Sequence, residues 1–400
     1  MSVRVDGLDA ADLVPLAAAY GHPGLSPTGA ARLHEHTGGH PLHVRHVLDQ
    51  VPMHAIVFGQ GPLPAPREVA AAVAADLAAC RPAGRALLDV GAVLGQRFRL
   101  ADAASLVDDA GLLDNAGLFD DAGLFDDRGV GAGDVVDDAR LVAEVPGSAG
   151  AELAFTSSLV RGVVYHALPR ARRRDLHRRA ARLGRPDALW HRVAAADGPD
   201  EALAADLCRR GAEHLARGRV QPGAAHLRAG LELTPAGPTR PARLLTAVEA
   251  LLVAGDIATA VEYAEQVAAL PRDAWSDYVN GYLLLVSGDQ AGARERLCRA
   301  YPMVDSDRGA GGDAPPGLRS RIASQLAILG VVSVNYADMV TYGAAAVADP
   351  DLPPWAAAFA WFTRALGLSV AGHSDAALAE LTGAHLPGSP PASTGSSRAA

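Results

Sequence analysis

The sequence predicts a mainly α-helical protein, and three observations lead to this fold class. Ala, Leu and Arg are abundant and aromatic residues make up only 5% of the 400 residues, a composition typical of helices that pack closely through small side chains. Apolar residues recur at helical intervals along most of the chain. A β-hairpin is indicated at one place only. The hydrophobic content of 49% is sufficient for packed cores.

Residues 1–60 are predicted to form a small helical subdomain. After a short extended segment, VRVDGL, helices are expected at 9–20, 26–37 and 40–51. Ser26 followed by Pro27 is a typical helix start, because the hydroxyl caps the first turn and proline fits its first position. Gly38 and Gly39 end the second helix.

Residues 61–185 are predicted to form a winged-helix-like domain. It begins with a proline-rich linker, GPLPAP, which should be stiff because proline fixes φ and removes a backbone donor. Amphipathic helices are expected at 67–80, 82–94 and near 100–107. The segments ARLVAEVP and AELAFT, separated by GSAG, read as a β-hairpin, and Ser157 caps the next helix. Three helices followed by a hairpin is the order of a winged-helix module.

An Asp-rich insert at 108–139 interrupts this domain. It repeats six residues three times, AGLLDN-AGLFDD-AGLFDD at 110–127, a period that fits neither a helix nor a strand. Tandem duplication within a loop is the preferred interpretation. A calcium loop is the alternative, but the alternate-residue Asp ladder with a closing Glu is missing. The carboxylates in question are Asp120, Asp121, Asp126 and Asp127.

Residues 186–386 are predicted to form an α-solenoid of tetratricopeptide-like helix pairs. The turns AGD at 254–256 and SGD at 287–289 are 33 residues apart, close to the 34-residue tetratricopeptide period. Stacked pairs would share a continuous core that no single pair can form. Two weaker pairs are expected at 317–348 and 353–386. The remaining residues, 387–400, have too few apolar side chains to fold and should form a disordered tail.

The segment RLHEHTGGHPLHVRHVLDQ at 32–50 is dense in histidine and raises the question of a metal site. Its histidines are His34, His36, His40, His43 and His46. No recognisable ligand spacing includes them. An apolar stripe is expected on Leu42, Val44, Val47 and Leu48, which would place His43 and His46 on the solvated side of a helix. We therefore predict solvated helix-face histidines and no metal, although a metal-dependent enzyme remains an alternative.

Several kinds of chemistry are disfavoured by residue types that the sequence lacks. All 36 basic residues are Arg, and a phosphate-gripping P-loop requires a Lys on the terminal phosphates. We therefore expect no ATP hydrolysis and no enzyme activity. No Gly-x-Ser-x-Gly elbow indicates a serine hydrolase. Cys80, Cys208 and Cys298 are too dispersed for a disulfide framework or metal site and are predicted to be buried small residues.

The most basic segment, PRARRRDLHRRAARLGR at 169–185, has two interpretations. It could bind nucleic acid, or it could be a helix face that neutralises the Asp-rich insert. We favour the second, because the net charge of −9 opposes a general attraction to nucleic acid or anionic membranes. The N-terminus lacks signal-peptide features and no apolar run approaches a membrane span, so a cytoplasmic protein without membrane contact is expected.

The segment LHEHTGGHPLHVRHVL closely resembles signal-transduction ATPases with numerous domains (STAND, AAA-like), in particular the large LuxR-type regulators. Their pattern here is approximately Leu-x-x-x-Thr-Gly-Gly-Asn-Pro-Leu-x-Val. The likeness continues through REVAAAVAADLAACRPAGRALLDVGAVLGQRF and LAFTSSLVRGVVYHALPRARRRDLHRRAA. It implies that residues 1–60 are the lid of a nucleotide-binding module, with Gly39, His40 and Pro41 beside the adenine of ATP or ADP. His40 replaces the usual Asn. Ser157 stands where the family tends to have a His that touches the nucleotide phosphate.

The resemblance also implies a role for the chain as a whole. The P-loop and the DNA-reading helix-turn-helix of the family have no counterpart in this sequence. We therefore expect the central part of such a regulator, which does not hold ATP or ADP on its own. Its partners would be an inducer or a protein at the helical repeats, together with nucleotide-binding and DNA-binding segments supplied elsewhere. An autonomous repeat scaffold with no nucleotide role is the alternative.

Overall fold

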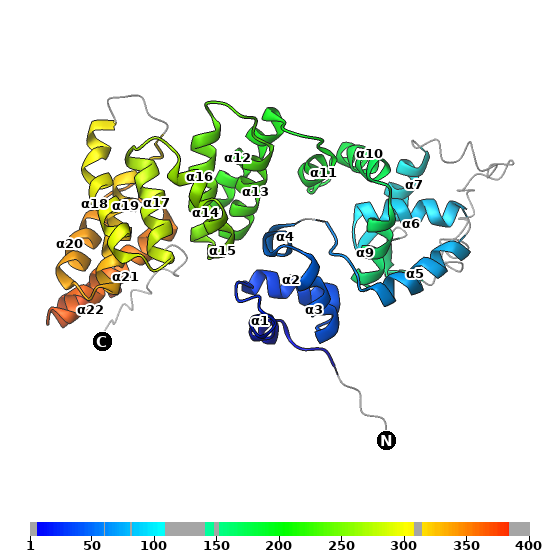
Figure 1. Ribbon diagram of the computed structural model, residues 1–400, viewed down its shortest axis with the longest axis horizontal. Helices are drawn as coiled ribbons and strands as arrows, with labels where there is room; N and C mark the ends of the chain where they lie inside the picture. Colours follow the sequence, from blue (N-terminus) through cyan, green and yellow to red (C-terminus); the bar gives the residue numbers. More distant parts are fainter. Residues whose placement is uncertain are drawn as a thin grey trace, which may run out of the picture. The chain divides into compact units, whose positions relative to one another are not determined.

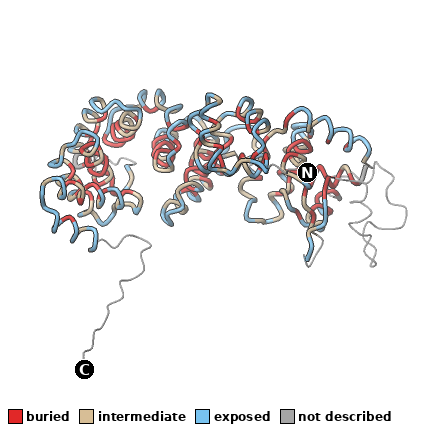
Figure 2. The backbone as a smooth tube through the Cα atoms, turned by 90° about the horizontal axis from the view of Figure 1, so that it is seen from below, coloured by how far each residue is buried: buried red, intermediate tan, exposed pale blue. Residues whose placement is uncertain are grey.

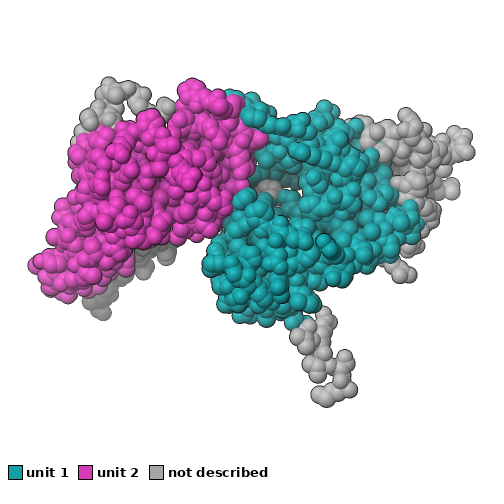
Figure 3. Space-filling view, viewed as in Figure 1, with its two compact units in different colours: residues 1–203 teal, residues 204–400 magenta. Residues whose placement is uncertain are grey.

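The computed structural model describes residues 6–59, 61–80, 82–108, 141–147, 152–307 and 314–383. The chain divides into two compact units, 1–203 and 204–400 (Figure 3), each of which is described by itself. The predicted mainly α-helical fold class is confirmed. Within the described residues, no helix is both long and apolar enough to cross a membrane.

Unit 1 begins with four helices (Figure 1): α1 (Ala10–Ala19), α2 (Pro27–Thr37), α3 (Pro41–Gln50) and α4 (Met53–Phe58). The first three confirm the predicted helices, and the Ser26 Oγ accepts a hydrogen bond from the Gly29 N–H at 3.2 Å, as expected for an N-cap. The six-residue helix α4 was not predicted from the sequence. Leu13, Leu33 and Ile56 are fully buried in the shared core.

The apolar stripe predicted on α3 is partly wrong. Val44, Val47 and Leu48 are buried, but Leu42 is 67% exposed. Leu42 is only the second residue of the helix, where the chain has just entered from the turn, so it lies away from the core face.

The second part of unit 1 combines helices with a small sheet. Its elements are α5 (Arg67–Ala79), α6 (Pro82–Leu94), β1 (Arg97–Arg99), α7 (Leu100–Asp108), β2 (Val142–Glu144), β3 (Glu152–Phe155), α9 (Ser158–Ala167), α10 (Arg170–Ala180), the 3-10 helix η1 (Ala181–Leu183) and α11 (Ala188–Ala195). The three predicted helices and the predicted hairpin are confirmed, with Ala143 opposite Ala154 in the antiparallel pair β2–β3. The strand β1 was missed, and it gives the sheet order β1-β3-β2.

The strand β1 is short because its sequence alternates for only three residues. Phe98 is buried between the exposed Arg97 and Arg99, and its ring lies 5.8 Å from that of Phe155 on β3. The Asp-rich repeat and its four named aspartates lie outside the described residues, as does the tail 387–400. The domain boundaries and the winged-helix assignment remain predictions.

Unit 2 consists of antiparallel helix pairs (Figure 1). The pairs are α12 (Glu201–Ala216) with α13 (Val220–Leu233), α14 (Arg240–Val253) with α15 (Ile257–Glu262) and α16 (Ala264–Ala268), α17 (Ala274–Val286) with α18 (Gln290–Asp307), α19 (Leu318–Val332) with α20 (Tyr336–Val347), and α21 (Pro354–Val370) with α22 (Ser374–Gly383). Every pair expected from the sequence is present. One expected helix, 257–270, is interrupted at Tyr263. Buried residues gather where helices face each other (Figure 2).

Small residues bring the paired helices close together, as the composition predicts. A Cβ added at Gly211 would lie 2.6 Å from the Leu227 side chain, and one at Gly281 would lie 2.8 Å from Leu297. Distances this short leave no room for any side chain, so glycine at these positions sets the separation between the helices of a pair.

The turns inside the pairs share one backbone geometry. A residue with positive φ lies two positions after the end of each first helix, and the next residue donates its N–H to the oxygen five positions back, as in a Schellman motif. In the second pair, for example, Gly255 has φ of 76° and the Asp256 N–H donates to the Leu251 oxygen at 3.0 Å. Four of these residues are glycines, but the fourth turn has Val334 with φ of 53°.

Replacing Val334 with glycine is therefore expected to raise the free energy of unfolding by about 1 kcal/mol, because a β-branched residue is strained in the left-handed region. Val334 is 75% exposed, so the substitution removes little packing. Urea unfolding of the full chain measures the change. The matched control is Val332→Gly at the last residue of α19, where φ is negative and glycine should destabilise. A Val334→Gly variant no more stable than the parent would contradict the prediction.

Candidate functional site

The predicted nucleotide-facing segment forms the turn between α2 and α3. Gly38 and Gly39 both have positive φ, 61° and 72°. The Gly39 oxygen accepts a hydrogen bond from the Leu8 N–H at 3.0 Å, and a Cβ on Gly39 would lie 2.0 Å from the Leu8 oxygen. The Thr37 hydroxyl donates to the Leu33 oxygen and accepts from the Gly39 N–H. Glycine is thus required at position 39, is favoured at position 38 by its positive φ, and is supported by the hydroxyl of Thr37.

His40 and Pro41 begin α3. Pro41 occupies its first turn, and the His40 side chain makes no capping hydrogen bond. The His40 ring instead stacks on that of His43, with centroids 4.2 Å apart. Both His40 and Pro41 are exposed.

Ser157 has a structural role at the start of α9. Its Oγ accepts a hydrogen bond from the Val160 N–H at 3.2 Å and so caps the helix. The adjacent Ser158 hydroxyl donates to the Glu35 oxygen at 2.8 Å. The start of α9 therefore lies against α2, the helix that leads into the Gly39 turn. Neither of the two cavities described below is lined by Gly39, His40, Pro41 or Ser157.

The histidines of this region do not share one environment. His43 and His46 are half-buried, not on a fully solvated face as predicted, and His36 is buried, with its Nε2 3.0 Å from the Pro64 oxygen. Burial lowers the pKa of His36 to about 4, so the ring is neutral and donates to Pro64. Across the described parts of the chain, no three His, Cys, Asp or Glu residues are grouped to hold a metal ion.

The cysteines are less buried than predicted. Cys298 is exposed, and Cys80 and Cys208 are half-buried.

The arginines of the most basic segment have defined carboxylate partners. Arg172 lies 3.6 Å from Asp89, Arg179 donates to Asp175 at 2.8 Å, and Arg185 pairs with Asp102. These partners belong to unit 1 itself. The Asp-rich insert that we expected as the partner lies outside the described residues. The ion pairs favour a structural role for these side chains.

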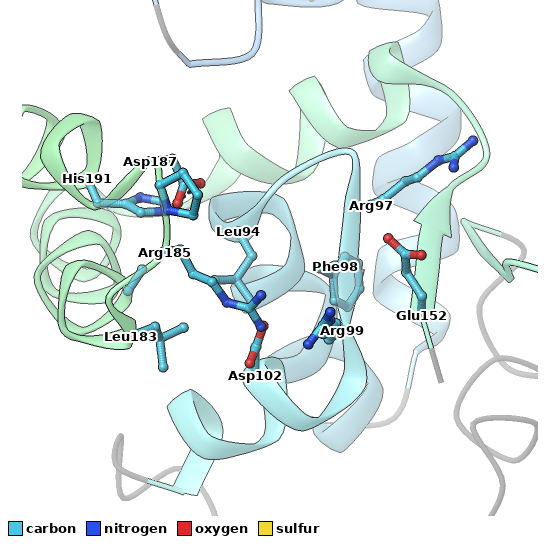
Figure 4. Close-up of a pocket in the computed structure, with 12 residues that line it drawn as sticks. Leu94, Arg97, Phe98, Arg99, Asp102, Glu152, Leu183, Arg185, Asp187 and His191 are labelled. Atoms are coloured by element: carbon cyan, nitrogen blue, oxygen red, sulfur yellow. Dashed lines mark hydrogen bonds and ion pairs between the residues drawn. The ribbon is translucent and has the colours of Figure 1, made fainter. Parts of the chain in front are cut away.

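A cavity of about 460 Å³ lies beside β1 and α11 (Figure 4). Positive and negative side chains line it in equal number: Arg97, Arg99, Arg185, Asp102, Glu152 and Asp187. Figure 4 shows Arg185 extended toward Asp102. The balanced charge gives this cavity no evident preference for a cationic or an anionic ligand.

A chain of hydrogen bonds runs from the edge of this cavity into the core. Asp187 lies 3.4 Å from the Nε2 of His191, the two Nδ1 atoms of His191 and His177 are 2.8 Å apart, and the His177 Nε2 is 2.8 Å from the Tyr165 hydroxyl. A carboxylate only accepts, so His191 donates from Nε2. Its Nδ1 must then accept from His177, and His177 in turn accepts from Tyr165. Asp187 thereby fixes the tautomer of both buried rings.

A second cavity, of about 480 Å³, lies in unit 2. Its walls come mainly from the first helices of successive pairs. They are mostly apolar and include Leu215, Val253, Trp275, Leu352 from the segment before α21, and Trp355 at the start of α21. Cavities of this size, with apolar walls and few polar groups, are typical of small-molecule sites.

A buried ion pair lies at the wall of the second cavity. The Arg321 Nη1 donates to both oxygens of Glu249, at 2.9 and 2.8 Å. The Tyr278 hydroxyl donates to Glu249 Oε1 at 2.9 Å. Burial, together with the Glu249 carboxylate, raises the pKa of Tyr278 well above its usual value, so the phenol remains a donor.

This network was not predicted from the sequence. Its members come from α14, α17 and α19, and Glu249 and Arg321 are 72 residues apart. The available signal was local: Glu249 interrupts an otherwise apolar helix face in AVEALLV, where a charged residue is buried only with a partner.

The chain was compared with known proteins. No family model matches it, and no curated protein matches it. A solved structure that it resembles is a signal transduction ATPase with numerous domains and a tetratricopeptide repeat sensor, from Pyrococcus horikoshii. The match covers 96% of this chain and 61% of that protein, with 11% identity and a TM-score of 0.31. A likeness at this level carries no argument about function.

Proposed function

We propose that this chain is a regulatory, non-catalytic region of a nucleotide-switched transcriptional regulator of the large LuxR type. The helical repeats of unit 2 would receive the signal, from an inducer or a partner protein. The observation that supports this role best is the cavity in unit 2, which the first helices of successive pairs enclose. Stacked helix pairs commonly use such concave surfaces for binding.

The proposed link to nucleotide rests on the turn between α2 and α3. Gly39 keeps the backbone in the form that the family pattern requires, His40 and Pro41 are exposed beside it, and α9 packs against α2. These contacts are compatible with a lid that lies over the adenine of a bound nucleotide. The phosphates of that nucleotide would have to be held by another segment, because this chain has no Lys.

Titration calorimetry with ADP distinguishes this function from the alternative, an autonomous repeat scaffold without a nucleotide role. Saturable heat of binding that weakens in the His40→Ala variant would favour the regulator. The regulator would bind ADP weakly at most without the phosphate-binding segments, so the titration extends to high ADP concentrations, and heats equal to those of dilution throughout would favour the scaffold.

The purified chain is expected to hydrolyse no ATP, because no ammonium group can neutralise the terminal phosphates as in P-loop enzymes. Phosphate release in the presence of Mg²⁺ and ATP should equal that of buffer. The control is a sample taken through an additional ion-exchange step, which removes contaminating ATPases. Turnover that persists in proportion to the amount of chain would contradict the non-catalytic assignment.

A further inference from the structure

The cavity of unit 2 contains two buried hydrogen-bond donors without partners. The indole Nε1 of Trp275 and the guanidinium Nε of Arg321 are both inaccessible to solvent and form no hydrogen bond. Both side chains line the cavity. Trp275 as a whole is only 7% exposed. A buried donor without a partner is unfavourable, so a ligand in this cavity that offers an acceptor would gain from both groups.

The charges around the cavity restrict the kind of acceptor. Both Glu249 oxygens already accept from Arg321, and Oε1 also accepts from Tyr278. The pair of Glu249 and Arg321 is neutral overall, and among the residues that the structure describes the other charged lining residue is Asp351, so this part of the lining has a net negative charge. A carboxylate ligand would be repelled. A neutral carbonyl oxygen would satisfy the unpaired donors without this cost.

The apolar walls of the cavity indicate the shape and polarity of the rest of the ligand. Trp275, Trp355 and Leu215 present flat or branched apolar surface, and several of the other lining residues are prolines. Such surfaces favour a planar or aromatic body, which gains from stacking against indole rings.

We propose that the cavity of unit 2 binds an uncharged, largely apolar small molecule that carries a carbonyl acceptor, and that Trp275 Nε1 and Arg321 Nε are the donors to this oxygen. This assignment rests on the proposed sensor role and names its ligand class. Binding requires a small adjustment of the two side chains, which brings their N–H groups to the cavity surface.

The probe is prodan, a neutral naphthalene ketone whose fluorescence reports an apolar environment, titrated into the full chain. Competitors of equal shape then test the acceptor: 2-acetonaphthone carries the carbonyl, 2-ethylnaphthalene lacks it, and 2-naphthoate adds a negative charge. We expect 2-acetonaphthone to compete about tenfold more strongly than 2-ethylnaphthalene, as a hydrogen bond of about 1.4 kcal/mol implies. 2-Naphthoate should compete less strongly than 2-acetonaphthone, because its negative charge is repelled although it also carries an acceptor oxygen.

Two matched variants assign the effect to a side chain. Trp275→Phe removes the donor and should reduce the advantage of the ketone to about threefold or less. Trp355→Phe removes an indole from the same cavity and should weaken both neutral competitors equally. Circular dichroism and urea midpoints confirm that both variants fold.

The proposal is overturned if prodan does not bind, if the two neutral competitors are equal, if 2-naphthoate competes best, or if Trp275→Phe leaves the ratio unchanged. These results are independent of the ADP titration. A chain that binds ADP but shows no preference for the ketone would refute the ligand class while leaving the regulator intact.

Discussion

Replacing Arg321 with methionine is expected to lower the free energy of unfolding of unit 2 by about 3 to 5 kcal/mol. The substitution leaves the Glu249 carboxylate without its cationic partner in a site where it is only 5% exposed. Removing one member of a buried ion pair typically has this cost, because the remaining charge stays desolvated. Methionine retains much of the apolar stem of Arg321, so lost packing contributes little.

The control for Arg321 is a double variant that also removes the buried charge. Glu249→Gln in the Arg321→Met background keeps an oxygen that accepts from the Tyr278 hydroxyl. We expect this double variant to be more stable than Arg321→Met alone, as measured by urea unfolding of the full chain. Additive losses in the two single variants would show that the ion pair is not the source of the effect.

Lowering the pH from 7 to 5 is expected to destabilise unit 1 by about 2 kcal/mol for each of His36 and His177. Burial lowers the pKa of His36 to about 4 and that of His177, which also lies beside His191, to about 3. Both rings therefore remain neutral in the folded state. In the unfolded chain they take up protons below about pH 6.5, so protonation favours unfolding as the pH falls.

Hydrogen exchange at pH 7 and pH 5, corrected for the intrinsic rate, measures this loss locally in peptides from α9 and α10. The interval from pH 7 to pH 5 lies above the pKa of ordinary carboxylates, so acid titration of Asp and Glu contributes little to this loss of stability. His36→Gln is the matched control, because its side-chain amide can still donate to the Pro64 oxygen but does not titrate. That variant should lose less stability between the two pH values. Equal pH dependence in the parent and in His36→Gln would refute the assignment for His36.

Helix pairing was predictable because its causes are local. The turn at Gly255 and Asp256 combines a residue that tolerates positive φ with a side chain that caps the next helix, since the Asp256 Oδ1 accepts from the Thr259 N–H. Both signals lie within a few residues in the sequence. The fourth and fifth pairs were expected only as weaker pairs. In the fourth turn Val334 stands in place of glycine, so one of these signals is absent there.

The buried polar groups were not predictable in the same way. Tyr165, His177 and His191 form one hydrogen-bonded chain, yet they come from three different helices, and His177 lies in an Arg-rich helix whose sequence is typical of a surface. Their pairing depends on how α9, α10 and α11 pack, and a single sequence does not define that packing. Glu249 and Arg321 are a further example, because each is explained only by the other.

According to the proposed function, unit 2 is the part of the chain that receives the signal. Hydrogen exchange of the full chain with and without saturating 2-acetonaphthone tests it most directly. We predict slower exchange in α14, α17 and α19, which carry Glu249, Trp275 and Arg321, and no change in α2 or α9. Protection confined to unit 1 would contradict this claim, whereas a lack of protection anywhere would refute only the ligand class.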